Sequence, residues 1–374
     1  MRRLKTFSLN IALLTASFTT GIAAGTGFCQ FSWAQSINSQ TIACSTASIL
    51  VTLALTRTCR MRESGGWLVG LYFLVGVLCG CTAVASSCSA PGAGPLQIAA
   101  EGFAARFRSM ILSLPFPHPE SPVLVNALLT GDKSGLDKDI ISAFRDSGAA
   151  HILALSGLHL GIIYGILRKV TSVMGNSPTA NKIRSAGIIF TTFLYTLATG
   201  AGPSLVRAQL FITINEISHL AQRRTSLGKV YCSALLIQLT MNPLVISSVG
   251  FQLSYMAMAG IVVLYPRMKA WFPENEEGRT KFVSYVPKKM WDAMALAISC
   301  QIFTGPVAWL YFGTFPKYFI ITNMFALPIT SLLMIMATLT ATLSAAGLCP
   351  TIIISITDKL SMMLIDIVQI IAGL

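Results

Sequence analysis

Two histidines and a serine lie close together in HILALSGLHLG, a segment that is otherwise apolar. They are His151, Ser156 and His159. Imidazole and hydroxyl groups can hydrogen-bond a polar ligand or relay a proton, and such groups are costly inside an apolar span. We expect them to line a wet path. The alternative is a structural role, in which each histidine hydrogen-bonds a neighbouring helix.

The spacing of these residues predicts one continuous helix over 151–168. On such a helix the histidines and the serine share one side, and three glycines share another side. A small residue at every fourth position allows a second helix backbone to approach closely. We therefore expect helix packing at Gly157, Gly161 and Gly165.

Two other segments bring polar residues to a similar depth. The stretch GAGPSLVR contains Pro203 and Arg207, and GFQLS contains Gln252 and Ser254. With His151 they point to an aqueous vestibule that carries positive charge in the outer half of a membrane. The alternative for Arg207 is that its long side chain reaches the membrane surface. Pro203 is expected to contribute to helix packing.

The elements that position these groups must be membrane helices. The 374 residues are 53% hydrophobic and 11% charged, and the mean hydropathy is +0.68. A soluble chain of this length needs more polar surface. We therefore expect an all-α polytopic membrane protein with about nine to eleven transmembrane or re-entrant helices. The apolar runs are 8–29, 41–56, 66–85, 150–168, 184–200, 204–221, 230–246, 251–266, 291–311, 318–346 and 351–371.

Basic residues alternate with these runs and predict the topology. Arg2, Arg3 and Lys5 place the N-terminus in the cytoplasm, because cytoplasmic loops are enriched in Lys and Arg. The same rule makes 168–184 cytoplasmic and 86–149 external. We thus expect residues 1–85 to hold N-terminal membrane helices. Residues 86–149 should form the outer segment, with an amphipathic helix at Leu96–Leu114, and 150–374 the membrane body.

The sequence offers little support for catalysis. Glu216 and His219 have the Glu-x-x-His spacing of a di-iron site, but the second such pair and the further carboxylates are missing. Phosphate-loop, zinc-protease and serine-hydrolase motifs are also missing. We therefore expect no enzyme, no catalytic residues, no cofactor and no metal site.

Residues 127–161 resemble the signature of the ComEC family, the inner-membrane channel of bacterial DNA uptake. The resemblance continues, in the same order, through GAGPSLVRAQ, GFQLSYMAMAGIVVLYP and QIFTGPVAWLYFGTFPKYFIITNMFALP. It covers about 122–346, the competence domain of that family. Longer members resemble a composite with an OB-type domain and a metallo-β-lactamase-like domain, and this sequence has no counterpart of either.

The resemblance implies passage of single-stranded DNA from periplasm to cytoplasm through the inner membrane during natural transformation. It implies a DNA path that includes Asp132, Lys133, Ser134, His151, Ser156, His159, Arg207, Gln252 and Ser254. It also implies a periplasmic DNA-binding protein, a cytoplasmic helicase or translocase and a separate nuclease as partners. The alternatives are a secondary transporter of a small anion and a non-transporting membrane scaffold.

Overall fold

The computed structural model describes residues 2–30, 66–87, 95–175, 177–271, 281–313, 318–348 and 350–373. Every regular element among these residues is helical, which confirms the predicted all-α class. The predicted span 41–56 lies outside them. The α-helices are α1 (Arg2–Gln30), α3 (Gly66–Ser87), α4 (Pro95–Leu112), α5 (Glu120–Thr130), α6 (Lys138–Asp146), α7 (Ala150–Leu153), α8 (Gly157–Thr171), α9 (Pro178–Ala198), α10 (Pro203–Leu220), α11 (Leu227–Met241), α12 (Val249–Val263), α13 (Tyr265–Lys269), α14 (Lys281–Phe312), α15 (Phe319–Ala345) and α16 (Thr351–Ala372).

Two described stretches are long and apolar enough to cross a bilayer. They are Pro287–Phe312, within α14, and Phe319–Ala345, which is α15. Shorter apolar helices occur at Ile11–Thr26, Gly70–Val84, Leu227–Met241 and Val249–Val263. These helices are compatible with a membrane protein. The count of about nine to eleven spans stays a prediction.

The chain forms two compact units. The first comprises Met1–Ala93 and Arg223–Gln252, and the second comprises Gly94–Gln222 and Leu253–Leu374. Helix α11 therefore belongs with the N-terminal helices and contacts α1. The expected division at residues 85 and 149 is based on changes in composition along the sequence. The two units are instead defined by contacts between helices.

Helices α1 and α3 of the first unit cross at two pairs of glycines. A Cβ atom at Gly21 or Gly25 would meet the backbone of α3. A Cβ at Gly76 or Gly80 would meet the backbone of α1. Each helix thus has a small-x-x-x-small stripe that faces the stripe of its partner. This is the arrangement that lets two helix backbones come into direct contact.

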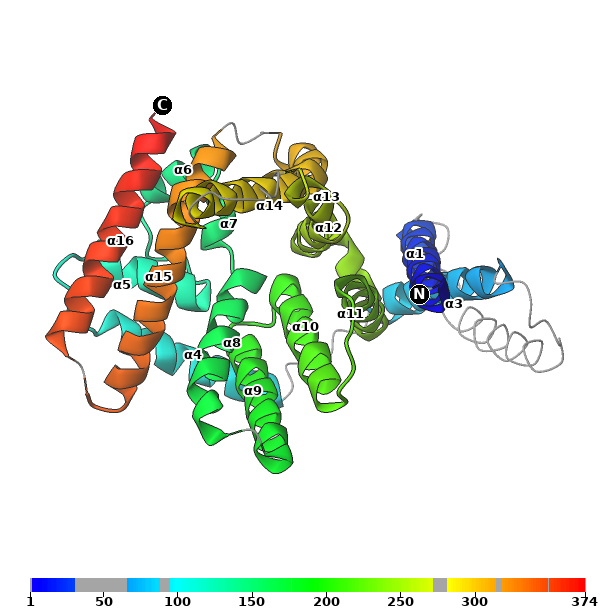
Figure 1. Cartoon of the computed structure of the whole chain (residues 1–374), viewed down its shortest axis with the longest axis horizontal. Helices are drawn as coiled ribbons and strands as arrows, with labels where there is room; N and C mark the ends of the chain where they lie inside the picture. Colours follow the sequence, from blue (N-terminus) through cyan, green and yellow to red (C-terminus); the bar gives the residue numbers. More distant parts are fainter. Residues whose placement is uncertain are drawn as a thin grey trace. The chain divides into compact units, whose positions relative to one another are not determined.

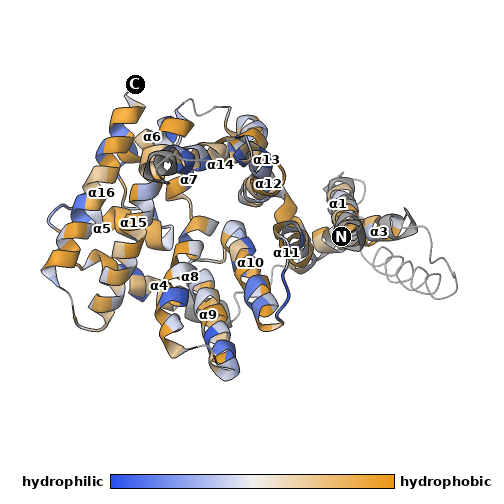
Figure 2. Ribbon diagram, in the orientation of Figure 1, coloured by the Kyte–Doolittle hydropathy of each residue, from blue (hydrophilic) through white to orange (hydrophobic). Residues whose placement is uncertain are grey.

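The core of the second unit lies between helices α4 to α6 and the last two helices, α15 and α16. It includes Ile111 of α4, Leu128 of α5, Phe144 of α6, Leu333 of α15 and Leu364 of α16, all fully buried. Helices α15 and α16 lie side by side (Figure 1). Figure 2 shows hydrophobic residues along most of both helices, and more hydrophilic segments on α9 and α10.

Helix α4 covers most of the stretch Leu96–Leu114, for which the sequence predicts an amphipathic helix. Ile111 and Leu114 are buried against the protein, whereas Phe103 is exposed and stacks on Phe107 with ring centroids 6.4 Å apart. The C-terminal end of α4 therefore packs on the protein's own surface. The exposed Phe103 stays available to another apolar surface.

Candidate functional site

The helix expected over 151–168 is interrupted, so that prediction is wrong at 154–156. Helix α7 ends at Leu153, and α8 begins at Gly157. Ser156 between them is extended, with φ −123° and ψ 168°, and its hydroxyl accepts a hydrogen bond from the backbone N–H of Leu158 at 3.2 Å. Serine is a favoured N-cap because it satisfies N–H groups that the first turn leaves unpaired. The two histidines therefore lie on different helices.

His159 completes a capping box with Ser156. Its Nδ1 accepts from the backbone N–H of Ser156 at 3.2 Å and lies 3.0 Å from the Ser156 hydroxyl. A nitrogen that accepts from an N–H carries no proton, so the proton of neutral His159 is on Nε2. This Nε2 is buried and has no hydrogen-bond partner among the described residues. A buried N–H of this kind is ready to bond a water molecule or a ligand oxygen.

His151 is exposed at its place on α7. Its Nδ1 lies 3.1 Å from the carbonyl oxygen of Gly148, to which it donates. The His151 ring is close enough to that of His159 for the two to interact electrostatically. The structure therefore keeps the two histidines near each other, although the helix between them is broken.

Arg207 is buried in the second turn of α10, with 9% of its surface exposed. Its Nη1 donates to the backbone carbonyl of Ser254 on α12 at 2.6 Å, and its guanidinium lies 6.0 Å from the ring centroid of Phe211. A Cβ at Gly157 would collide with Nη2. Arg207 thus joins the start of α8 to α10 and α12.

The glycine stripe on α8 does not behave as expected. Gly157 allows the close approach of a guanidinium, not of a helix backbone. Apart from the backbone of α8 itself, no atom of the described chain lies within 4 Å of the Cβ position at Gly161 or Gly165. The expected helix contact at these two glycines is therefore not made within the described residues. Pro203 occupies the first turn of α10, where its missing N–H costs nothing.

Gln252 bonds to its own segment of the chain. It belongs to the first unit, and its Nε2 donates to the carbonyl oxygen of Ile246 at 3.0 Å. That bond closes the turn that leads into α12. Ser254 belongs to the second unit and offers Arg207 its backbone oxygen. Arg207 therefore contacts the backbone of Ser254, whereas the amide of Gln252 bonds a carbonyl six residues before it.

The loop after α5 is held by Asp132. One carboxylate oxygen accepts from the backbone N–H of Ser134 at 3.1 Å, and the other accepts from Arg108 Nη1 of α4 at 3.0 Å. Hydrogen bonding from the Ser134 side chain, then from its backbone N–H and from Arg108, lowers the pKa of the Asp132 carboxyl. Partial burial lowers the pKa of the neighbouring Lys133 amine. Asp132 thus shapes the loop, and Ser134 is exposed at its surface.

The loop and α8 are joined through apolar and polar contacts. Gly131 has φ +79°, and a Cβ there would meet the side chain of Leu155, which precedes the cap of α8. The Tyr195 hydroxyl near the end of α9 donates to the carbonyl oxygen of Leu129 at 2.6 Å. The loop 131–137 therefore lies next to the break between α7 and α8.

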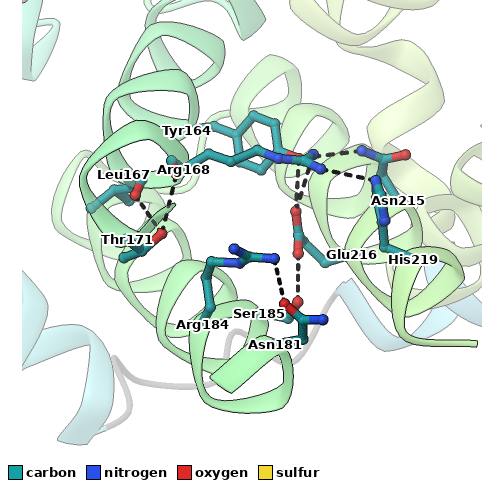
Figure 3. A network of polar contacts seen from close by, with 10 residues as sticks. All are labelled: Tyr164, Leu167, Arg168, Thr171, Asn181, Arg184, Ser185, Asn215, Glu216 and His219. Carbon is teal, nitrogen blue, oxygen red and sulfur yellow. Dashed lines mark hydrogen bonds and ion pairs between the residues drawn. The ribbon is translucent and has the colours of Figure 1, made fainter. Parts of the chain in front are cut away.

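A polar network joins the far ends of α8 and α10 to the start of α9 (Figure 3). The buried Glu216 accepts from the Tyr164 hydroxyl at 2.7 Å and from the Ser185 hydroxyl at 2.6 Å. Arg168 Nη1 donates to the same Tyr164 hydroxyl at 2.7 Å, and Nη2 bonds His219 Nε2 at 2.9 Å. Arg168 also forms an ion pair with Glu216 at 3.7 Å.

Sequence reasoning missed this network. The sequence pattern gives Glu216 and His219 the spacing of a metal site and places Arg168 in a basic cytoplasmic loop. The usable signal was the four-residue spacing of Tyr164 and Arg168, which puts both on one helix face. Together with the only acidic residue of α8, α9 and α10, that spacing could have indicated a buried ion pair.

Comparison with known proteins gives the family. The family described as Competence protein matches residues 128–374. ComE operon protein 3 of Bacillus subtilis is 30% identical over 147 residues, which are 39% of this chain and 18% of that protein. Recombination protein 2 of Haemophilus influenzae is 26% identical over 219 residues, which are 57% of this chain and 27% of that protein.

An uncharacterized protein of Escherichia coli, YcaI, is 28% identical over 161 residues, which are 42% of this chain and 21% of that protein. The chain thus spans about a fifth to a quarter of the length of these relatives. No solved structure matches it. The family match includes α8, α9 and α10 with both of their polar ends, and the chain belongs to the Competence protein family.

Proposed function

We propose that this protein passes single-stranded DNA from the periplasm to the cytoplasm through the bacterial inner membrane during natural transformation. The observation that carries the proposal is the family match over residues 128–374, which contains nearly all of the polar groups described above. The resemblance of residues 127–161 to the ComEC signature supports the same activity. The apolar helices α14 and α15 support a place in the membrane.

We assign two kinds of role to the expected path residues. Lys133, Ser134 and His151 keep exposed or partly exposed surface, so they can contact the strand directly. Asp132, Ser156 and Arg207 are engaged by neighbouring backbone groups and position those contacts. Strand passage needs contacts that release phosphate readily, and a few separated polar groups meet that need better than a dense basic cluster.

The proposal extends to topology and partners. A multi-pass protein with a cytoplasmic N-terminus would expose loop 131–137 to the periplasm. A periplasmic DNA-binding protein would present DNA there. A cytoplasmic helicase or translocase would draw the strand inward, and a separate nuclease would remove the other strand.

The test is to delete the gene and follow labelled transforming DNA in cell fractions. We expect the deletion strain to take DNA into the periplasm, where external nuclease no longer reaches it, and to show no label in the cytoplasm. A plasmid copy of the gene should restore cytoplasmic label. Cytoplasmic label at wild-type level in the deletion strain would exclude the proposed function.

A further inference from the structure

Arg168 combines a fixed position with an exposed guanidinium. Its side chain is 41% exposed, in contrast to the buried Arg207. The contacts in Figure 3 occupy one N–H of Nη1, through Tyr164, and one position of Nη2, through His219. A guanidinium has five N–H donors in a planar fork, so donors remain for a further acceptor. An exposed, pre-oriented guanidinium is well suited to a phosphate group.

Glu216 reduces the charge of Arg168 without occupying its donors. The two carboxylate oxygens accept from the hydroxyls of Tyr164 and Ser185, and the nearest guanidinium nitrogen lies at 3.7 Å. The Tyr164 hydroxyl therefore stands between the two charges. Because Glu216 is buried, solvent screens its field less than it would screen that of an exposed carboxylate.

The surrounding charges also favour an anion. Lys169 and Lys182 are exposed near this end of α8 and α9, and Arg184 is partly exposed and donates to the Asn181 side chain at 2.6 Å. Glu216 is the only acidic residue of α8, α9 and α10. This end of the three helices is therefore basic, with one buried carboxylate that moderates it.

We infer that Arg168 is a contact for the phosphodiester backbone of single-stranded DNA, and that Glu216 keeps this contact weak enough to release the strand. The inference rests on the proposed function. Arg168 belongs to the end of α8–α10 opposite Arg207, because Glu216 follows Arg207 by nine residues on α10, about 14 Å along the helix. In the proposed topology this end faces the cytoplasm, where the strand leaves.

The experiment measures binding of a fluorescent oligothymidylate to the full chain in nanodiscs of phosphatidylcholine, at several salt concentrations. We expect Arg168→Ala to weaken binding and to lower the slope of log affinity against log salt by about 0.7, the value for one phosphate contact with a single strand. Arg168→Lys should keep most of the slope. Glu216→Gln should tighten binding about threefold, because it removes a negative charge that offsets the positive charge of Arg168 and that solvent screens only in part.

The coupling between the two residues is the sharper measurement. Glu216→Gln should have no effect on oligonucleotide binding when Arg168 is already alanine. It should retain its full effect in a Lys169→Ala background, the matched control, because Lys169 is exposed on the same helix and takes no part in the network. Equal effects of Glu216→Gln in both backgrounds would show that the carboxylate does not act through Arg168.

Two other results would overturn the inference. If Arg168→Ala leaves the salt slope unchanged but reduces retention of anionic lipid by the protein, measured by mass spectrometry, Arg168 binds lipid phosphate instead of DNA. If the wild-type chain binds oligonucleotide and Arg168→Ala binds it equally well, this site is wrong while the proposed function stands. Failure of the wild-type chain to bind any oligonucleotide would count against both.

Discussion

Two arginines serve opposite ends of the same three helices, and they differ in what surrounds them. Arg207 is buried, donates to the Ser254 carbonyl and lies against Gly157. Arg168 is 41% exposed, and its guanidinium is held by the side chains of Tyr164 and His219. A guanidinium bonded to a backbone carbonyl in a buried site fixes helices. A guanidinium that is held by side chains on one side and exposed on the other can still bind a ligand.

The comparison shows that residue type and depth do not decide function without exposure. Arg207 has the residue type, the depth and the family motif that indicate a DNA contact. Its burial instead favours a role in holding α8, α10 and α12 together. Arg168 occupies a position that the charge pattern explains through topology alone. Because Arg168 is exposed and Glu216 lies near its guanidinium, it is suited to a second role as a phosphate contact.

The largest expected effect concerns the sides of the membrane on which the two ends lie. With single cysteines in a cysteine-free background, Asp137→Cys should react with a membrane-impermeant thiol reagent in cells whose outer membrane is open. Ser177→Cys should react only after the inner membrane is permeabilised, because basic loops stay in the cytoplasm. Labelling of both cysteines from the same side would contradict the proposed topology. The Arg207 end and the Arg168 end of the three helices could not then be the entrance and the exit of the strand.

The next effect is the loss of Arg207. Arg207→Ala removes a charged hydrogen bond to a buried carbonyl and the packing of the side chain over Gly157, so we expect a loss of stability of about 3 kcal/mol. Thermal unfolding in detergent and protein abundance in cells measure it. Arg168→Ala is the matched control and should change unfolding much less, because its side chain is half exposed. If Arg207→Ala is present at normal abundance but DNA stalls in the periplasm, Arg207 contacts the strand directly and is not only a structural residue.

The helical class and most helix positions could be predicted from the sequence, because a long apolar run has few alternatives to a helix. The break before α8 could not, because the apolar pattern continues through it. Only the choice of Ser156 as a cap, with His159 in the place usually taken by Glu or Gln, marks it. A capping histidine is a weak signal in a sequence that is apolar on both sides.

The glycines show a second limit of sequence reasoning. Glycines recur at four-residue spacing on α1, α3 and α8, and among the described residues those on α1 and α3 make a close helix crossing whereas Gly161 and Gly165 of α8 do not. A stripe needs a matching stripe on the helix that faces it, and one sequence does not say which helices face each other. Buried polar networks have the same limit, since Glu216 finds its partners on two other helices.

A smaller effect separates two glycines of α8. Gly157→Ala should destabilise the protein by about 2 kcal/mol, because the new Cβ displaces the Arg207 guanidinium from its place. Gly161→Ala should be neutral or stabilise by up to about 1 kcal/mol, because the Cβ enters open space and alanine favours the helix. Thermal unfolding in detergent compares them. A large loss at Gly161→Ala would reveal a helix contact made outside the described chain.

The smallest effect is the pH dependence of the loop that holds Lys133 and Ser134. Hydrogen bonds from Ser134 and Arg108 lower the pKa of the folded Asp132 below its ordinary value of 3.8, so the charged carboxylate stabilises the folded loop above that pH. This contribution is lost as the pH falls through the folded pKa, below about 4. Asp132→Asn should therefore lower stability at pH 6 and bring the variant closer to wild type at pH 3. The difference in stability between the variant and wild type should be small even at pH 6, because Arg108 and Asp132 are both partly exposed.

Thermal unfolding of both proteins at the two pH values measures this difference. An equal difference at both would show that the carboxylate charge does not hold the loop, and that Lys133 and Ser134 owe their positions to the turn at Gly131 alone.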